Sequence, residues 1–199
     1  MMPTATSKRR LVARLAHVVN ELSSPIIANP MVSVTIGLTT GSWAWTAALT
    51  VFTGVLPAAI IFGSLWLNRI SDHHVTDRDE RPLIMGAILS SLIAGLVLFM
   101  LASAPASILG VDAAMLATLS TLAVITVGLR WKISVHSAVW AGIAGMLSVT
   151  FGPWAASTFA IVPIVMWGRV HVQDHSIGQV IAGALVGGVV ASSTFALFG

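Results

Sequence analysis

Long apolar runs separated by short polar segments make up most of the chain. A helix needs about 20 apolar residues to cross a bilayer, and most of the runs approach that length. The runs lie near 25–42, 44–68, 83–104, 111–131, 136–151, 153–168 and 176–198. The first contains Pro25 and Pro30 and could be re-entrant. The pattern therefore predicts seven spans, with six as the alternative.

Composition agrees with this pattern. The chain has 199 residues, of which 56% are hydrophobic and 9% charged, whereas soluble domains carry about 25% charged residues. We expect an all-α, polytopic transmembrane helix bundle that forms one domain over 25–199. The sequence has no Cys and no Tyr, which excludes disulfides, thiolate nucleophiles, Cys-based metal sites and tyrosyl chemistry.

A basic amphipathic segment, 1–24, precedes the first apolar run. Apolar side chains recur there at helical spacing, and basic side chains accompany them: Leu11, Leu15, Val18 and Leu22, with Lys8, Arg9, Arg10 and Arg14. Such a helix is typical of one that rests on an anionic membrane surface. A solvated basic tail is the alternative. Because no apolar stretch directly follows the first ten residues, we expect no cleaved signal peptide.

Small residues four positions apart recur in the later runs: Ala141 and Gly145, Gly183 and Gly187, Ala184 and Gly188. In lipid, such pairs allow helix backbones to approach closely. We expect them to form the core of the bundle and to carry no chemistry.

Three polar islands interrupt the apolar pattern, at 68–82, 130–136 and 169–179. If the spans alternate in direction, all three islands lie on one face of the membrane. The ten Lys and Arg residues then lie on that face as well, provided that the first run spans the membrane. Because Lys and Arg favour the cytoplasmic side, we expect this face to be cytoplasmic, in the inner membrane of a bacterium.

The islands hold residues suited to phosphate chemistry. Each supplies a cation, Arg81, Lys132 or Arg169, and the second adds the Ser134 hydroxyl. The N–H groups of Val135 and His136 would open a helix, where anions bind well. His136 and His175 are candidates for a nucleophile and a proton donor. The combination predicts phosphoryl transfer on a lipid.

The islands also resemble the motifs of the type 2 phosphatidic acid phosphatase family, the membrane branch of the vanadium-haloperoxidase-like acid phosphatases. HVTDRDERP resembles the first motif, with Arg81-Pro82 in place and His74 where the family has Lys. ISVH keeps the Ser and His of the second. Arg169 and His175 match the third, in which Gly168 replaces Ser and Gln179 replaces Asp. The resemblance covers 74–179.

The resemblance implies a mechanism that needs no metal and no cofactor. His175 would attack phosphorus to form a phosphohistidine, and His136 would protonate the leaving alcohol. Arg81 and Arg169 would hold the phosphate, with Ser134 and the Val135 N–H as further donors. Arg78, Lys132 or His74 would stand in for the missing Lys.

Gln179 stands where the family keeps an acid. It follows His175 by four residues, so on a helix both side chains share a face. Its amide oxygen would accept a hydrogen bond from Nδ1 of His175 and orient the ring. Asp174 or Asp72 could instead supply a carboxylate, although we otherwise interpret Asp174 as a spacer in its loop.

The resemblance implies a lipid phosphomonoester or diphosphate as substrate. A cytoplasmic site favours a biosynthetic step on a polyprenyl-linked phosphate, such as the polyprenyl-phosphoribose phosphate of actinobacterial cell-wall synthesis. Phosphatidic acid and phosphatidylglycerol phosphate are other candidates. The bilayer is the expected partner, and nucleic acid is not. The sequence leaves open a homo-oligomer and a partner enzyme in biosynthesis.

Three other interpretations remain open. His73 and His74 lie among acidic residues and could bind a metal, but a solvated loop explains them as well. The same loop resembles the Asp-rich motif of Mg²⁺-dependent membrane prenyltransferases, although no second acidic motif follows. The chain could also be a non-catalytic binder of lipid phosphate. We interpret Asp112, remote from the islands, as a helix N-cap.

Overall fold

A computed structural model describes residues 5–199, and their side chains from residue 9 onward. This part of the chain is helical and contains no strand. The elements are α1 (Ala5–Leu22), α2 (Pro25–Gly37), the 3₁₀ turn η1 (Leu38–Thr40), α3 (Trp43–Thr50), the π-helical turn η2 (Val51–Val55), α4 (Leu56–Trp66), α5 (Arg81–Leu101), α6 (Ala106–Gly128), α7 (Val135–Phe151), the 3₁₀ helix η3 (Pro153–Ala160), α8 (Ile161–His171) and α9 (Ile177–Phe198).

Four stretches of helix in the described part are long and apolar enough to cross a membrane. They are Trp43–Trp66, which joins α3, η2 and α4, and the single helices α5, α6 and α9. The pair α1 and α2, bent by 47°, makes a fifth if it counts as one span. The chain therefore has the helices of a membrane protein, but length and composition do not confirm six or seven spans. The other predicted runs form shorter pieces, α7 and the η3–α8 pair.

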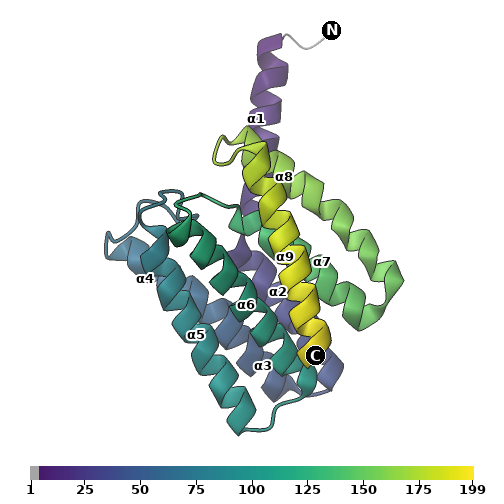
Figure 1. Cartoon of the computed structure of the whole chain (residues 1–199). Coiled ribbons are helices and arrows are strands. Elements are labelled where there is room, and N and C mark those ends of the chain that lie inside the picture. The colour runs from purple at the N-terminus through teal and green to yellow at the C-terminus, as the bar shows by residue number, and fades with distance from the viewer. Residues whose placement is uncertain (1–4) are drawn as a thin grey trace.

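The polar islands gather at one end of the helix bundle. Figure 1 shows that α4, α6 and α8 end there and that α5, α7 and α9 begin there. The connecting segments 67–80, 129–134 and 172–176 therefore share that end. The sequence predicts this arrangement from the alternating direction of its apolar runs.

Helix α1 projects beyond the same end of the bundle (Figure 1). Its apolar stripe is exposed, with 58% of Leu11, 49% of Leu15 and 53% of Val18 accessible. The junction of α1 with α2 is fixed from a distant helix, because the indole N–H of Trp140 donates to the carbonyl oxygen of Ser23 at 2.9 Å. The last turn of α1 is thereby held against the polar end of the bundle.

Helices α7 and α9 pack at very close range. A Cβ atom on Gly183 would lie 2.3 Å from the carbonyl oxygen of Ser134, and one on Gly187 would lie 1.9 Å from that of Ala138. Only glycine fits at such distances, so the prediction of close contacts between small residues is confirmed. The contact matters for function because it brings the first turn of α9 beside the first turn of α7.

Asp112 does not cap a helix, and that prediction was wrong. Helix α6 begins at Ala106, directly after Pro105, because proline readily starts a helix. Asp112 therefore lies within α6, fully buried. Neither of its carboxylate oxygens has a hydrogen-bond partner within the described residues.

Candidate functional site

Arg81 links the first polar island to the second. It is the first residue of α5 and is 4% exposed. Its Nε donates to the carbonyl oxygen of Val75 at 3.0 Å, and its Nη1 donates to that of Ile133 at 3.1 Å. Val75 has a φ of 49°, a left-handed conformation that costs energy for a β-branched residue. The bond from Arg81 helps to hold that conformation.

The second island provides the start of α7. Ser134 is its N-cap, and its buried hydroxyl accepts from the N–H of Ser137 at 3.4 Å. Val135 is the first helical residue, so its N–H is one of those that an α-helix leaves without an internal partner. His136 follows and is 4% exposed, and its Nε2 has no hydrogen-bond partner among the described residues.

His175 lies in the loop before α9 and is 6% exposed. Its Nδ1 is 3.1 Å from the carbonyl oxygen of Lys132 and 3.3 Å from Oε1 of Gln179. The Gln179 oxygen also accepts from the N–H of Ser176 at 2.9 Å, which fixes which end of the amide faces the ring. Because both partners are acceptors, Nδ1 carries the proton. Nε2 of His175 therefore holds a lone pair, and it is buried without a hydrogen-bond partner in the part of the chain that the structure describes.

Arg169, near the end of α8, is fully buried. One of its nitrogens pairs with the Asp174 carboxylate at 2.9 Å, and Nη1 donates to the side-chain oxygen of Asn20. The interpretation of Asp174 as a loop spacer was wrong, because it is the ion-pair partner of Arg169. No sequence motif indicates Asn20, which lies 149 positions away on α1. In the sequence, Asn20 is recognisable only as a polar residue near the end of an amphipathic helix.

The amide of Asn20 also reaches the first island. Its nitrogen lies 2.9 Å from Nε2 of His74. The His74 ring in turn lies 5.2 Å from the ring of His136, between centroids. The side chains of Arg169, Asn20, His74 and His136 thus form one chain of contacts. It connects α1 and all three islands.

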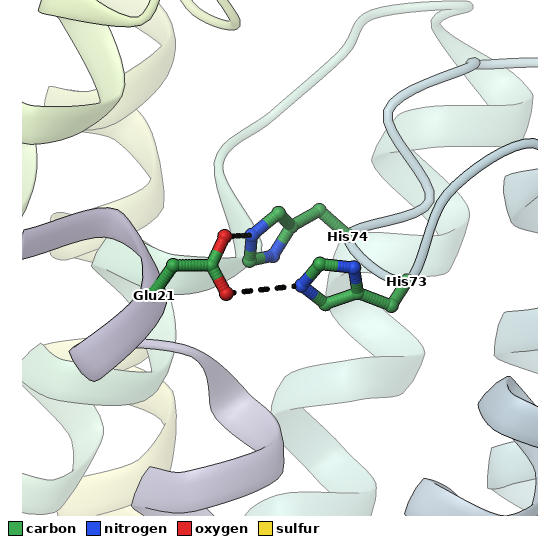
Figure 2. Close-up of side chains that lie close together, drawn as sticks. All are labelled: Glu21, His73 and His74. Atoms are coloured by element: carbon green, nitrogen blue, oxygen red, sulfur yellow. Dashed lines mark hydrogen bonds and ion pairs between the residues drawn. The ribbon is translucent and has the colours of Figure 1, made fainter. Parts of the chain in front are cut away.

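Glu21, next to Asn20, binds two adjacent histidines (Figure 2). Its Oε1 is 3.0 Å from Nε2 of His74, and its Oε2 is 3.2 Å from Nε2 of His73. The Asp72 carboxylate accepts from the backbone N–H of His74 at 2.8 Å. Asp72 therefore shapes this loop. In the described structure the hydrogen bonds of its carboxylate go to residues of the loop and not to His175.

Charge and burial set the protonation of the site. Burial, followed by the charges of Arg169, Arg81 and Lys132, lowers the pKa of His175 to about 3. Burial also lowers the pKa of His74. The pKa of Lys132 is lowered by burial and then by the charge of Arg81. His175 is therefore neutral near pH 7, in the form that can act as a nucleophile.

A cavity of about 600 Å³ adjoins these residues. Its polar lining residues are Ser24, His73, His74, Arg81 and His136, whereas His175 and Arg169 lie outside its lining. A second cavity, of about 790 Å³, is almost entirely apolar. The two cavities share six lining residues: Pro25, Ile26, Ile61, Ile88, Leu119 and Val135. They therefore adjoin each other, one at the polar end and the other in the apolar interior.

Arg78 lies apart from the other predicted phosphate ligands. Its side chain is 44% exposed, donates to the carbonyl oxygen of Arg130 at 3.2 Å and lies 3.7 Å from the Asp79 carboxylate. These contacts hold it at the surface of the loop. Of the candidates for the missing Lys, His74 lies beside His136.

No protein-family model, no curated protein and no solved structure matches this chain. The geometry of the polar end of the bundle is therefore what indicates a function.

Proposed function

We propose that this chain is an integral membrane phosphatase that hydrolyses a lipid phosphomonoester or diphosphate through a phosphohistidine. One observation carries the proposal: His175 is buried and neutral, its Nδ1 proton faces two acceptors, and its Nε2 lone pair is free. This is the state that a histidine nucleophile requires. The resemblance to type 2 phosphatidic acid phosphatases supports the same role.

In the first step, Nε2 of His175 forms a bond to phosphorus, and the bond from phosphorus to the leaving oxygen breaks. His136 donates a proton to that oxygen, since its ring lies in the polar lining of the cavity. The negative charge of the substrate favours the protonated form of His136. In the second step, His136 takes a proton from water, and the water oxygen displaces His175 from phosphorus.

The cations and N–H groups around the two histidines bind the phosphate. Arg81 lines the cavity directly, whereas Arg169 lies outside its lining and has its charge balanced by Asp174. Lys132, Ser134 and the Val135 N–H complete the set. Such fixed donors stabilise the charge on a transferring phosphoryl group.

The apolar cavity supports a lipid substrate. A headgroup phosphate placed between His175 and the polar lining of the first cavity would leave its chain toward the apolar cavity, which is lined mainly by α2, α4, α5, α6 and α7. A polyprenyl-linked phosphate, such as polyprenyl-phosphoribose phosphate, suits a long apolar cavity. Phosphatidic acid and phosphatidylglycerol phosphate fit the same description of charge and chain.

We further infer a bacterial inner-membrane protein whose site faces the cytoplasm. The described Lys and Arg side chains lie on α1 or on segments at the polar end, as expected for the cytoplasmic side. In this arrangement α7 and the η3–α8 pair complete six or seven crossings, and α1 rests on the membrane surface. Thr76→Cys tests the side, because the chain has no other Cys. Labelling of that cysteine from outside intact cells would show that the polar end does not face the cytoplasm.

Phosphate release by the purified chain across a panel of lipid phosphates tests the activity. We expect His175→Ala to lower release by roughly 10³-fold or more, whereas His171→Ala, an exposed histidine of the same segment, should not. Vanadate should inhibit the reaction, and EDTA should spare it. If His175→Ala released as much phosphate as the native chain, His175 would not be the nucleophile. Loss of activity in EDTA would favour a metal-dependent enzyme.

A second candidate is a non-catalytic binder of lipid phosphate. It is favoured by Gln179 in place of an acid, and by Arg169, which is already engaged by Asn20 and Asp174. Such a protein would retain phospholipid through purification and release no phosphate from any member of the panel.

A further inference from the structure

We propose that Glu21, His73 and His74 form a binding site for a divalent transition-metal ion, with Zn²⁺ as the best match. The three side chains offer one carboxylate oxygen and two imidazole nitrogens, all within 4.8 Å of one another. Figure 2 shows them converging from α1 and from the loop before α5. The site shares His74 with the candidate phosphate-binding residues, but the proposed phosphatase chemistry needs no metal.

The distances suit zinc. Zn–N and Zn–O bonds are about 2.0–2.2 Å, so ligand atoms at tetrahedral angles lie roughly 3.3–3.6 Å apart. Oε1 of Glu21 lies 3.0 Å from Nε2 of His74, and Oε2 lies 3.2 Å from Nε2 of His73. One ligand atom from each residue lies within 4.8 Å of the other two, so an ion would draw the three side chains closer together. Two imidazoles and one carboxylate are also the ligand set of many zinc enzymes, in which water takes the fourth position.

The local backbone explains how two neighbours in sequence can serve one ion. Consecutive residues of an extended chain point to opposite sides, but the rings of His73 and His74 lie 4.1 Å apart, between centroids, and face the same carboxylate. The bonds from Asp72 to the loop backbone and the left-handed conformation of Val75 produce this turn. Both histidines therefore present Nε2 toward Glu21 from one loop.

The contacts around Nε2 of His74 leave its approach to the Glu21 carboxylate unfavourable unless a cation lies between the two. Asn20 accepts from Arg169 through its oxygen, so its amide nitrogen faces Nε2 of His74. Nε2 of a neutral ring either donates or accepts. It cannot accept from Asn20 and also donate to Glu21. A metal ion bound to Nε2 of His74 would take the lone pair that faces Asn20, so the Asn20 N–H would turn to another acceptor. The ion would in return make the contact between Glu21 and the two histidines favourable.

Ligand type separates zinc from the metal of a prenyltransferase. Mg²⁺ prefers oxygen ligands and octahedral geometry, whereas imidazole nitrogen suits Zn²⁺ and other transition metals. The site therefore does not indicate Mg²⁺-diphosphate chemistry. His73 and His74 line the 600 Å³ cavity, which gives an ion a route to the site and leaves a coordination position for water or a phosphate oxygen.

Equilibrium dialysis of the full chain in detergent, with Zn²⁺ and without lipid, tests the site. We expect one Zn²⁺ per chain, not displaced by excess Mg²⁺. His73→Ala and Glu21→Gln should each weaken binding by roughly tenfold or more, whereas His17→Ala and His171→Ala should not change it. Glu21→Gln keeps the size of the side chain, and gel filtration with circular dichroism checks that each variant is folded.

Two results would overturn the proposal: no Zn²⁺ bound beyond the level of the His73→Ala chain, or equal weakening in His171→Ala. Replacement of Zn²⁺ by Co²⁺ gives a second reading, since a tetrahedral Co²⁺ site with nitrogen ligands absorbs strongly in the visible range. Because these measurements involve no substrate, a failure here leaves the phosphatase proposal intact. A failure of phosphate release likewise leaves the metal site intact.

Discussion

Nδ1 of His175 lies 3.1 Å from the carbonyl oxygen of Lys132, which is closer than the side-chain oxygen of Gln179 at 3.3 Å. The start of α7 and the start of α9 thus jointly fix the tautomer of this histidine. A backbone carbonyl takes the place of the carboxylate that the family resemblance leads one to expect. It orients the ring as an acid would, but it supplies no full negative charge to a charged imidazole.

Gln179 supports this arrangement only in part, so Gln179→Ala should have a moderate effect on catalysis. One hydrogen bond is worth about 1 kcal/mol, which corresponds to a fall in kcat of roughly fivefold to tenfold. The bond to Lys132 remains and preserves the tautomer. Steady-state phosphate release measures the change, and KM should stay close to that of the native chain.

Ser176→Ala is the matched control for that variant. Ser176 and Gln179 form a capping box at the start of α9, and loss of the cap costs about 1 kcal/mol of stability. Ser176 makes no contact with the His175 ring among the described hydrogen bonds, so kcat should be unchanged. If Gln179→Ala also leaves kcat unchanged, Gln179 only caps the helix and does not orient His175.

The low pKa of His175 predicts that acid destabilises the fold. The unfolded chain has an ordinary histidine of pKa 6.5, and the folded chain has one of about 3. Between these values the unfolded state binds a proton that the folded state does not, so the free energy of unfolding falls as pH falls from 6.5 toward 3. At pH 5 the loss should be on the order of 2 kcal/mol.

Thermal unfolding midpoints in detergent at pH 7 and pH 5 measure this effect. The native chain should lose more stability between the two than His175→Asn, which has no imidazole to protonate. Comparison of the two chains isolates His175 from the other titrating groups. Equal losses in both would show that His175 is not held neutral by the fold.

The sequence predicted the helical class and the shared end of the polar islands because both follow from simple patterns. Apolar periodicity sets the helices, and alternation of their direction sets the ends. It also placed Arg81, His136 and His175 in one neighbourhood through their motif spacing. Close packing of α7 on α9 followed from the small residues Gly183 and Gly187.

Such patterns do not predict contacts between residues that lie far apart in the sequence. The amphipathic pattern assigns Asn20 and Glu21 to a surface helix, yet they contact Arg169 and the histidine pair. The angle between α1 and α2 decides this, and no local motif encodes that angle. Asp174 was interpreted as a spacer because a charged loop residue is usually solvated, whereas the full burial of Arg169 requires a counter-charge.

Gly187→Ala should destabilise the bundle and impair the site. Its Cβ would lie 1.9 Å from the carbonyl oxygen of Ala138, so α7 and α9 must separate, at a cost of about 1–3 kcal/mol. Gly188→Ala is the control, since its nearest neighbour would be Ala141 Cβ at an ordinary 3.7 Å. Thermal unfolding should show a lower midpoint for the first variant only. Equal midpoints would mean that α9 adjusts without strain.

Asp174→Asn should destabilise the chain strongly because it leaves the Arg169 guanidinium buried without its counter-charge. Breaking a buried ion pair by removing one partner costs about 3–5 kcal/mol. Asp79→Asn removes a carboxylate that is 84% exposed beside Arg78, and such surface pairs contribute about 0–1 kcal/mol. Unfolding midpoints in detergent should therefore fall for Asp174→Asn and stay constant for Asp79→Asn.

Addition of vanadate or phosphate refines the Asp174 experiment. If Arg169 belongs to a phosphate site, an anion can replace the lost carboxylate. The ligand should then raise the unfolding midpoint of Asp174→Asn more than that of the native chain, because only binding to the folded state stabilises it. An equal rise of the unfolding midpoint in both chains would show that Arg169 does not bind the phosphate. Arg169 would then be buried only because it pairs with Asp174 and Asn20.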